Sequence, residues 1–397
     1  MIKRERVLES IRPFYFAMDI VKVITGIRRA GKSVLLSQIA DELLEHGIAD
    51  DRIIFINLEL LEYTCLTDYL ELYKFIKEKI NPAEKYFVFF DEIQLVDKFE
   101  LTINSLRAGG NVSLFITGSS AHLLSGELAT HLSGRYVQFF VSPFTFSEAL
   151  QMSAEPDRKK AFAKYMKWGG LPGHFAFVNE DEKRKYLQDV YNSVILRDIV
   201  QRSGIRDLNL LGNIIQFIIE NTGTIFSANT ISKYLKSQNR NVSAEALYNY
   251  VGHLTNSLLF NKLNRFDLKG KNVFSTLEKY YIADLGLLQI KRSFLDERLG
   301  ARFETIIANE LLARGYRIYV GVRRNAEIDF VAEKNGEVEY IQAAYIINSD
   351  ETLKRELGAF DGIAEKKTLI TFDEYDYSTK GIKSVNVIDW LSEPVIK

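Results

Sequence analysis

The sequence predicts an α/β protein in its first third. Five apolar runs there have the length of buried strands, and stretches with helical periodicity separate them. Because these runs are apolar on both faces, they predict a parallel sheet with helices covering both sides. The expected strands cover residues 21–25, 53–58, 86–90, 113–117 and 136–141.

Composition limits the class of protein. The chain has 397 residues, which is enough for about two to four domains. Its 26 Phe and 20 Tyr residues supply enough apolar surface to exclude a disordered chain. A single cysteine, Cys65, excludes a disulfide framework and a multi-cysteine zinc site. No uncharged apolar run approaches the roughly 18–20 residues of a membrane span, and the first residues are charged, so we expect a cytoplasmic protein with no membrane partner.

The pattern divides the chain into four expected domains. Residues 1–146 form the α/β unit, and residues 147–205 form a helical lid or linker that a Gly-Gly-Leu-Pro-Gly stretch interrupts. Residues 206–292 predict three helices and a β-hairpin, which are the components of a winged helix. Residues 293–397 predict a separate small α/β domain. The helices expected in the last two parts cover 210–221, 227–236, 243–260, 302–314 and 351–363, and the C-terminal strands cover 317–322, 327–333, 339–346 and 367–372.

A phosphate-binding motif stands between the first strand and the first long helix. It reads GIRRAGKS and matches the GxxxxGK[ST] pattern of the P-loop, or Walker A motif. Its glycines let backbone N–H groups surround phosphates, and the helix N-terminus favours their negative charge. Lys32 can reach the β- and γ-phosphates, and Ser33 can bind Mg²⁺. A Gly-rich surface turn is the alternative, which the flanking strand and helix disfavour. The predicted ATP contacts are Gly26, Ile27, Arg28, Arg29, Ala30, Gly31, Lys32, Ser33 and Val34.

Two acids end the third predicted strand, in the manner of a Walker B motif. Asp91 falls at the carboxyl edge of the sheet, where open α/β folds bind their ligands, and can hold Mg²⁺. Glu92 can orient or deprotonate the attacking water. Thr117 and Ser119 follow the next strand, and we expect either to sense the γ-phosphate or to cap the following helix. Arg135 precedes the last strand and can act as an arginine finger in a neighbouring subunit, unless it is a plain surface residue.

Taken together, GIRRAGKS, FFDEIQ, ITGSSA, SGR and WGGLPG resemble the motifs of bacterial and archaeal AAA-type P-loop ATPases of the STAND-like branch, in a family with a C-terminal domain of unknown function. The resemblance covers nearly the whole chain. It implies that Lys32, Ser33, Asp91 and Glu92 bind ATP and magnesium, that Thr117 is the sensor and that Arg135 is the finger. It also implies that Pro172 belongs to a lid motif whose proline packs near the adenine.

The winged-helix segment is a candidate for binding double-stranded DNA. Residues 206–292 contain 11 basic and 6 acidic residues, so this segment carries +5 within a chain whose net charge is −1. Tyr248 and Asn249 on the expected recognition helix would face a groove, and Lys269 and Lys271 on the hairpin turn would meet phosphates, which places DNA contact within 227–272. Winged helices also act as packing modules, and Glu245 on the same helix is unfavourable near phosphate.

The C-terminal segment resembles the PD-(D/E)xK nuclease core. By that resemblance Asp329 and Gln342 would bind Mg²⁺ from adjacent strands, and a lysine two residues after Gln342 would polarise the phosphate. Ala344 occupies that position and removes the only cation that the pattern provides, although in such folds a lysine from elsewhere can replace it. We therefore expect a degenerate domain used for recognition or assembly, with nuclease activity as the alternative.

The motifs together predict an enzyme. Because both Asp91 and Glu92 are present, we expect Mg²⁺-dependent ATP hydrolysis coupled to a conformational change on DNA or on an unknown protein partner. An arginine finger that acts in trans also predicts a nucleotide-dependent homo-oligomer. Two alternatives remain, namely a nucleotide-bound switch or scaffold with little turnover, and an ATP-gated nuclease.

Overall fold

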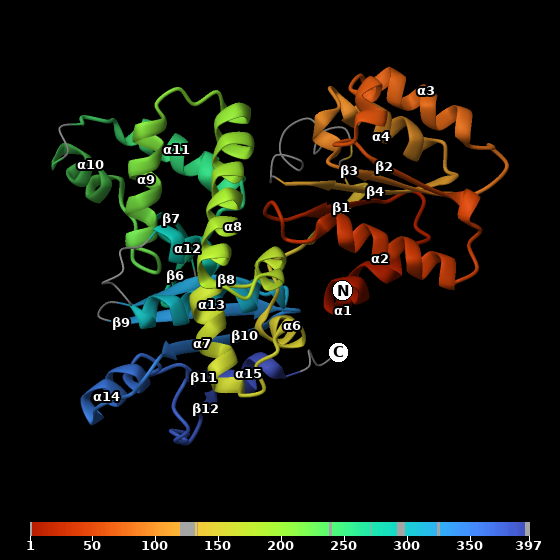
Figure 1. Cartoon of the computed structure of the whole chain (residues 1–397). Coiled ribbons are helices and arrows are strands. Elements are labelled where there is room, and N and C mark those ends of the chain that lie inside the picture. The colour runs from red at the N-terminus through yellow and green to blue at the C-terminus, as the bar shows by residue number, and fades with distance from the viewer. Residues whose placement is uncertain are drawn as a thin grey trace. The chain divides into compact units, whose positions relative to one another are not determined.

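The structure is a computed structural model, and it describes residues 2–119, 132, 134–237, 240–270, 272–291, 298–323 and 326–393. The chain forms two compact units, Met1–Val141 and Ser142–Lys397 (Figure 1). No helix in the described ranges combines the length and the apolar character needed to cross a membrane.

The first unit is built on a five-stranded parallel sheet. Its strand order is β2-β3-β4-β1-β5, so β1 lies between β4 and β5. The α/β fold class predicted from the sequence is therefore confirmed. The rings of Phe89 and Phe115 stack in the core at a centroid distance of 4.6 Å, and both are fully buried. The strands are β1 Val21–Thr25, β2 Ile53–Asn57, β3 Tyr86–Asp91, β4 Val112–Gly118 and β5 Tyr136–Phe140.

Helices cover both faces of this sheet, as the apolar strands require. Figure 1 shows α1 and α2 on one face and α3 and α4 on the other. Their bounds are α1 Glu5–Ile11, α2 Lys32–Glu45, α3 Tyr69–Lys79 and α4 Phe99–Ala108. Short 3-10 turns lie at Arg12–Phe14, Asp50–Arg52, Leu61–Leu66 and Ile93–Leu95.

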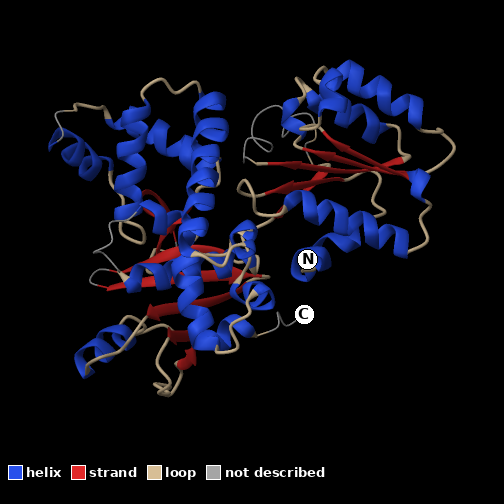
Figure 2. Cartoon of the chain, viewed as in Figure 1, coloured by secondary structure: helices blue, strands red, loops and turns tan. Residues whose placement is uncertain are grey.

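The second unit combines helices with a seven-stranded mixed sheet of order β12-β11-β10-β9-β8-β6-β7 (Figure 2). Its strands are β6 Phe260–Asp267, β7 Asn272–Ile282, β8 Arg317–Arg323, β9 Ala326–Lys334, β10 Glu337–Ala344, β11 Lys366–Thr371 and β12 Lys383–Asn386. Its helices are α6 Phe146–Met152, α7 Arg158–Trp168, α8 Glu180–Ser193, α9 Leu208–Glu220, α10 Ala228–Ser237, α11 Ala244–Asn256, α12 Leu285–Lys291, α13 Leu299–Ala313, α14 Asp350–Gly358 and α15 Val387–Ser392. A 3-10 turn spans Pro172–Ala176, and α8 continues as a π-helix over Val194–Gln201.

This sheet differs from the expectation of a separate domain that begins at residue 293. β6 of the predicted hairpin pairs in parallel with β8, with Phe266 opposite Gly321. The hairpin and the C-terminal strands therefore share one hydrogen-bonded sheet. Parallel pairing joins segments that are distant in the chain, so no local pattern marks it. The division into four domains stays a prediction.

Several element ends also differ from the sequence expectation. The helix predicted over 243–260 ends at Asn256, because Phe260 begins β6 and is buried. The helix predicted over 351–363 ends at Gly358. The short elements α1, β12 and α15 were missed, since elements of four to seven residues show little periodicity.

Candidate functional site

The phosphate-binding motif forms a tight loop between β1 and α2. Its first residue, Gly26, lies against the end of β5, where a Cβ atom on Gly26 would stand 2.2 Å from the carbonyl oxygen of Val141. No side chain fits at that distance. Glycine is therefore required at the start of the motif by the close approach of two backbone segments, and the loop keeps its narrow entry.

Lys32 and Ser33 open helix α2 in different environments. The Lys32 side chain is buried, and its Nζ donates hydrogen bonds to the carbonyl oxygens of Gly26 at 2.9 Å and Ile27 at 3.3 Å. The ammonium group thus lies within the loop that the P-loop pattern wraps around phosphates. Ser33 is exposed at the helix N-terminus, where the helix dipole favours anions.

One residue that supports this loop was missed by sequence reasoning. Arg4 is only 2% exposed, and its Nη1 donates to the carbonyl oxygen of Ala30 at 3.0 Å. Its backbone N–H donates to Oε1 of Gln38 on α2 at 3.1 Å. The segment before α1 therefore holds both the loop and the helix that follows it. An arginine close to the start of a chain carries no motif that would have revealed this contact.

The paired acids and Thr117 meet at the carboxyl ends of β3 and β4. Asp91 is 1% exposed, and its Oδ1 accepts a hydrogen bond from Thr117 Oγ1 at 2.5 Å. The same Thr117 oxygen accepts from the backbone N–H of Glu92 at 3.0 Å. Glu92 is buried, has a positive φ of 56° and accepts a side-chain hydrogen bond from Gln94. Thr117 thus orients both acids. Ser119, the alternative sensor, is also buried.

The sheet order brings these groups beside the phosphate-binding loop. β4 lies between β3, which carries the acids, and β1, which leads into the loop. Because all three strands are parallel, their carboxyl ends share one edge of the sheet. Three functional groups lie there, namely the Lys32 ammonium, the Ser33 hydroxyl and the Asp91 carboxylate. They fit a Mg²⁺–nucleotide complex, because the ammonium suits phosphates and the two oxygen groups suit Mg²⁺, which takes few protein ligands and binds substrate phosphates.

Arg135 lies at the amino ends of the strands, opposite the carboxyl ends that carry the phosphate-binding loop. It directly precedes β5, and Val21, the first residue of β1, pairs with Tyr136. The phosphate-binding loop instead follows Thr25, at the far end of β1. About four residues of strand, or roughly 13 Å, therefore separate the two ends. Arg135 is exposed, and in the described residues no ion pair joins its guanidinium.

The WGGLPG motif forms a buried turn in the second unit, and Pro172 begins its 3-10 helix. The Asp284 carboxylate accepts from the backbone N–H groups of Gly170 at 2.7 Å and Leu171 at 3.1 Å. Burial raises the pKa of Asp284 to about 6, although these backbone donors oppose the shift. A Cβ on Gly170 would stand 2.0 Å from the carbonyl oxygen of Phe144. A Cβ on Gly169 would likewise stand 2.4 Å from Asp284 Oδ1, so neither Gly169 nor Gly170 leaves room for a side chain. The adenine contact of Pro172 stays a prediction.

A polar cavity of about 750 Å³ lies at the mixed sheet of the second unit. Asp329 and Gln342, on neighbouring strands, are joined by a hydrogen bond of 2.8 Å from the Asp329 backbone N–H to Gln342 Oε1. Ala344 lines this cavity as expected. The inference that the alanine leaves the cluster without a cation is wrong, because Lys279 Nζ on β7 pairs with Glu327 at 2.5 Å. Burial lowers the pKa of Lys279, but the carboxylates of Glu304, Glu327 and Asp329 outweigh this effect and raise it.

Burial raises the pKa of both Glu304 and Asp329, and the negative charge of neighbouring carboxylates raises both further, so carboxylates are crowded in this cavity. Even so, in the described part of the chain no group of three or more His, Cys, Asp or Glu side chains is placed to hold a metal ion. The nuclease-like assignment of this region stays a prediction.

The elements expected for a winged helix occur in the predicted order, as α9, α10 and α11 followed by the β6–β7 hairpin. Tyr248 and Asn249 on α11 are exposed, and so is Lys269 on the hairpin turn. Lys271 lies outside the described residues. The assignment as a winged helix stays a prediction.

A parallel sheet of this order, with a phosphate-binding loop after β1 and paired acids after β3, defines a P-loop nucleoside-triphosphatase fold. A family model described as "AAA domain" matches residues 19–150, and one described as a domain of unknown function (DUF8612) matches residues 159–297. An uncharacterized protein of Haemophilus influenzae is 37% identical over 399 residues, with 98% of each chain covered. The chain therefore belongs to the same family as that protein, and its residues 19–150 match the AAA domain of P-loop nucleotide-binding proteins.

Two further similarities are more distant. An uncharacterized protein of Methanocaldococcus jannaschii is 28% identical, with 93% of this chain and 85% of that protein covered. Among solved structures, this chain is similar to the Aeropyrum pernix Orc1 protein in complex with DNA. The similarity covers 79% of this chain and 94% of the Orc1 chain, with 11% sequence identity and a TM-score of 0.35. The family assignment rests on the sequence matches alone.

Proposed function

We propose that the protein hydrolyses Mg²⁺-ATP at the carboxyl edge of its five-stranded sheet. The observation that carries this proposal is the hydrogen-bonded chain from Asp91 through Thr117 to Glu92, on strands that neighbour the phosphate-binding loop. A site that only holds nucleotide has no need of a second acid at this position.

Each residue has a defined part in the reaction. Lys32 leaves its loop carbonyls to bind the β- and γ-phosphate oxygens, and Ser33 and Asp91 hold the cation. A Mg²⁺ ion held by these two residues would neutralise charge that develops on the phosphates. Glu92 orients the attacking water and accepts its proton, while Thr117 keeps the two acids in place.

Substitution of Lys32 and Glu92 tests this function. We expect Lys32→Ala to abolish ATP binding and turnover, and Glu92→Gln to keep binding while turnover falls about 100-fold or more. Lys77→Ala, on the exposed face of α3, is the matched control. Turnover would be measured at saturating Mg²⁺-ATP and binding by calorimetry. Equal turnover in both variants and the wild-type chain would overturn the proposal.

Arg135 is proposed to complete the site of a neighbouring subunit. Its place at the opposite edge of its own sheet supports action in trans. Light scattering with a slowly hydrolysed ATP analogue is expected to show a homo-oligomer. Turnover by Arg135→Ala should fall about 1000-fold and recover in part when this variant is mixed with Lys32→Ala, because mixed assemblies contain intact sites. A strict monomer that binds nucleotide tightly with negligible turnover would favour the switch or scaffold.

We further propose that hydrolysis is coupled to double-stranded DNA through residues 227–272, or else to a protein partner. Exposed Tyr248, Asn249 and Lys269 and the +5 charge of residues 206–292 support DNA. Binding to a random 30-base-pair duplex is expected to weaken with salt and to lose about one unit of salt slope in Lys269→Gln. Lys185→Gln, outside this segment, is the control. No measurable binding to the duplex at low salt would exclude DNA and leave the protein partner.

A nuclease is the second candidate function, because Lys279 supplies the cation that Ala344 lacks. Cleavage of single- and double-stranded DNA and RNA would be tested in Mg²⁺ and Mn²⁺, with and without ATP. Activity lost in Asp329→Asn and Lys279→Met would establish this function. No cleavage under any condition would dispose of it and leave recognition or assembly.

A further inference from the structure

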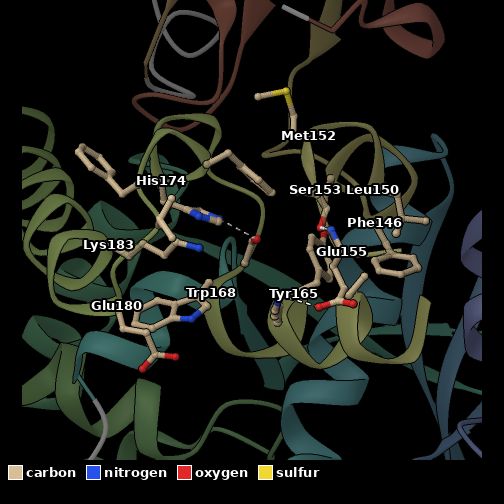
Figure 3. A pocket seen from close by; sticks show the side chains of 18 residues that line it. Phe146, Leu150, Met152, Ser153, Glu155, Tyr165, Trp168, His174, Glu180 and Lys183 are labelled. Atoms are coloured by element: carbon tan, nitrogen blue, oxygen red, sulfur yellow. Dashed lines mark hydrogen bonds and ion pairs between the residues drawn. The ribbon is translucent and has the colours of Figure 1, made fainter. Parts of the chain in front are cut away.

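Another cavity lies entirely within the second unit, beside the WGGLPG turn. It measures about 360 Å³ and is bounded by α6, α7, the start of α8 and the two loops between them (Figure 3). Aromatic, aliphatic and charged side chains all line it. The aromatic lining residues are Phe146, Tyr165, Trp168, Phe175 and Phe177. A cavity of this size with aromatic side chains and a few polar groups is typical of a site for one bulky apolar group that carries polar atoms.

Two polar groups in this cavity lack a partner among the described residues. The His174 side chain is 3% exposed, and its Nδ1 is buried without a hydrogen bond. Lys183 is half-buried on the same wall in Figure 3, and among the described residues its ammonium group has neither an ion pair nor a hydrogen bond. The remaining charges that line the cavity are paired, Glu155 with Lys164 at 2.8 Å and Glu180 with Lys167 at 2.6 Å. A buried polar atom without a partner costs free energy that a ligand can recover.

The chemistry of these two groups specifies the ligand. His174 Nε2 lies 3.1 Å from the carbonyl oxygen of Gly169, which can only accept, so Nε2 carries the proton. Burial lowers the pKa of His174 to about 4, so the ring is neutral at physiological pH and Nδ1 is an acceptor. The ligand must therefore offer an N–H or O–H to Nδ1, an anion to Lys183 and an apolar body to the aromatic walls.

The carboxyl-terminal residue of a polypeptide has these three groups together, as its amide N–H, its carboxylate and its side chain. The rim of the cavity favours a polypeptide over a small molecule. Val178 is 96% exposed and Met152 is 39% exposed, so apolar surface continues outside the cavity. We propose that this pocket binds the carboxyl terminus of a partner protein that ends in an aromatic or large aliphatic residue.

The test uses the full chain without nucleotide, so its outcome is independent of ATP hydrolysis. Fluorescein-labelled Gly-Ser-Gly-Ser-X peptides, with X as Phe, Trp, Tyr, Leu, Ile, Val or Met, would be titrated by fluorescence anisotropy. We expect at least one to bind with a Kd below about 100 µM. Conversion of its carboxylate to an amide should weaken binding about tenfold, and so should N-methylation of the last residue.

Two variants on α8 locate the site. Lys183→Gln should weaken the best peptide about tenfold, and Lys185→Gln, which lies outside the pocket, should leave it unchanged. Circular dichroism would verify that both variants fold. Three results would each overturn the proposal: no binding by any peptide at about 1 mM, equal binding of acid and amide, or N-acetylphenylalanine binding as tightly as the peptide, which would indicate a small-molecule site.

Discussion

The two sheets of this protein each carry a polar cluster, but they assemble it differently. In the five-stranded sheet, Asp91 ends β3 and Glu92 follows it, Thr117 lies one residue before the end of β4, and the loop follows β1. In the seven-stranded sheet, Lys279, Glu304, Asp329 and Gln342 come from four elements, and the lysine comes from an edge hairpin. Contiguous motifs reveal the first cluster, whereas only the folded sheet reveals the second.

The first cluster depends on backbone geometry, and Gly26→Ala tests that dependence most severely. Its Cβ would stand 2.2 Å from a backbone oxygen, so the loop or β5 must move. We expect ATP affinity, measured by calorimetry, to fall about 100-fold or more. Gly212→Ala in α9 is the control, since its Cβ would meet nothing within 4 Å, and it should stabilise the chain by up to about 1 kcal/mol. Unchanged affinity in Gly26→Ala would show that the loop adapts.

The turn at Gly170 should depend on Asp284 in a comparable way. In Asp284→Asn the amide nitrogen would replace one of the oxygens that accept from Gly170, Leu171 and Gly286. We expect the free energy of unfolding to fall by about 2–4 kcal/mol, measured by urea denaturation. Asp189→Asn, exposed on α8, is the control. A loss below about 0.5 kcal/mol would show that water replaces the carboxylate.

The second cluster should depend on charge rather than on backbone geometry. Lys279→Met leaves Glu327 and its neighbours without their buried cation, so we expect a loss of about 3 kcal/mol in thermal unfolding. The double variant with Glu327→Gln should recover part of this loss. Lys269→Met, on the exposed hairpin turn, should have almost no effect. Additive losses in the double variant would argue against a pair that acts as a unit.

His174 predicts a pH dependence that belongs to the second unit. Its pKa is about 4 in the folded chain and about 6.5 when unfolded. The unfolded chain therefore binds a proton at His174 first as the pH falls, and the contribution of His174 to stability falls by about 2 kcal/mol between pH 7 and pH 5. The raised pKa values of Asp284, Glu304 and Asp329 act in the opposite direction in the same pH range, so the test compares two chains. Urea denaturation at both pH values should show that acidification favours His174→Gln over the wild-type chain by about 2 kcal/mol. Equal changes in the two chains would assign the pH dependence to other groups.

Thr117→Val is expected to have the smallest effect. It removes the hydroxyl that joins Asp91 to the Glu92 backbone and keeps the shape of the side chain. We expect turnover to fall about tenfold while ATP affinity changes by less than about twofold. Thr67→Val, exposed before α3, is the control. A loss of affinity instead would indicate that Thr117 binds nucleotide rather than orienting the acids.

Much of the fold could be predicted because local patterns were strong. The predicted range of β1 matches the strand, and those of β2 to β5 differ from it by one residue at one or both ends, since buried strands are apolar throughout and end at polar residues. The pairing of β6 with β8 could not be predicted, because it joins distant segments without a motif. Arg4 and Asp284 were missed for the same reason, because their partners are backbone atoms far along the chain. His174 lies only five residues from its partner, Gly169, and was missed because a lone histidine carries no motif.

The amino-acid sequence alone determined the α/β class, the phosphate-binding loop and the acids after β3, because each is encoded by neighbouring residues whose chemistry needs a fixed spacing. Only the tertiary structure decided that Lys279 supplies the cation of the second cluster, that Arg135 lies at the edge opposite the loop, and that His174 and Lys183 share a pocket. These are arrangements that arise when separate elements pack against one another. Their energies depend on burial and distance, which exist only once the chain has folded.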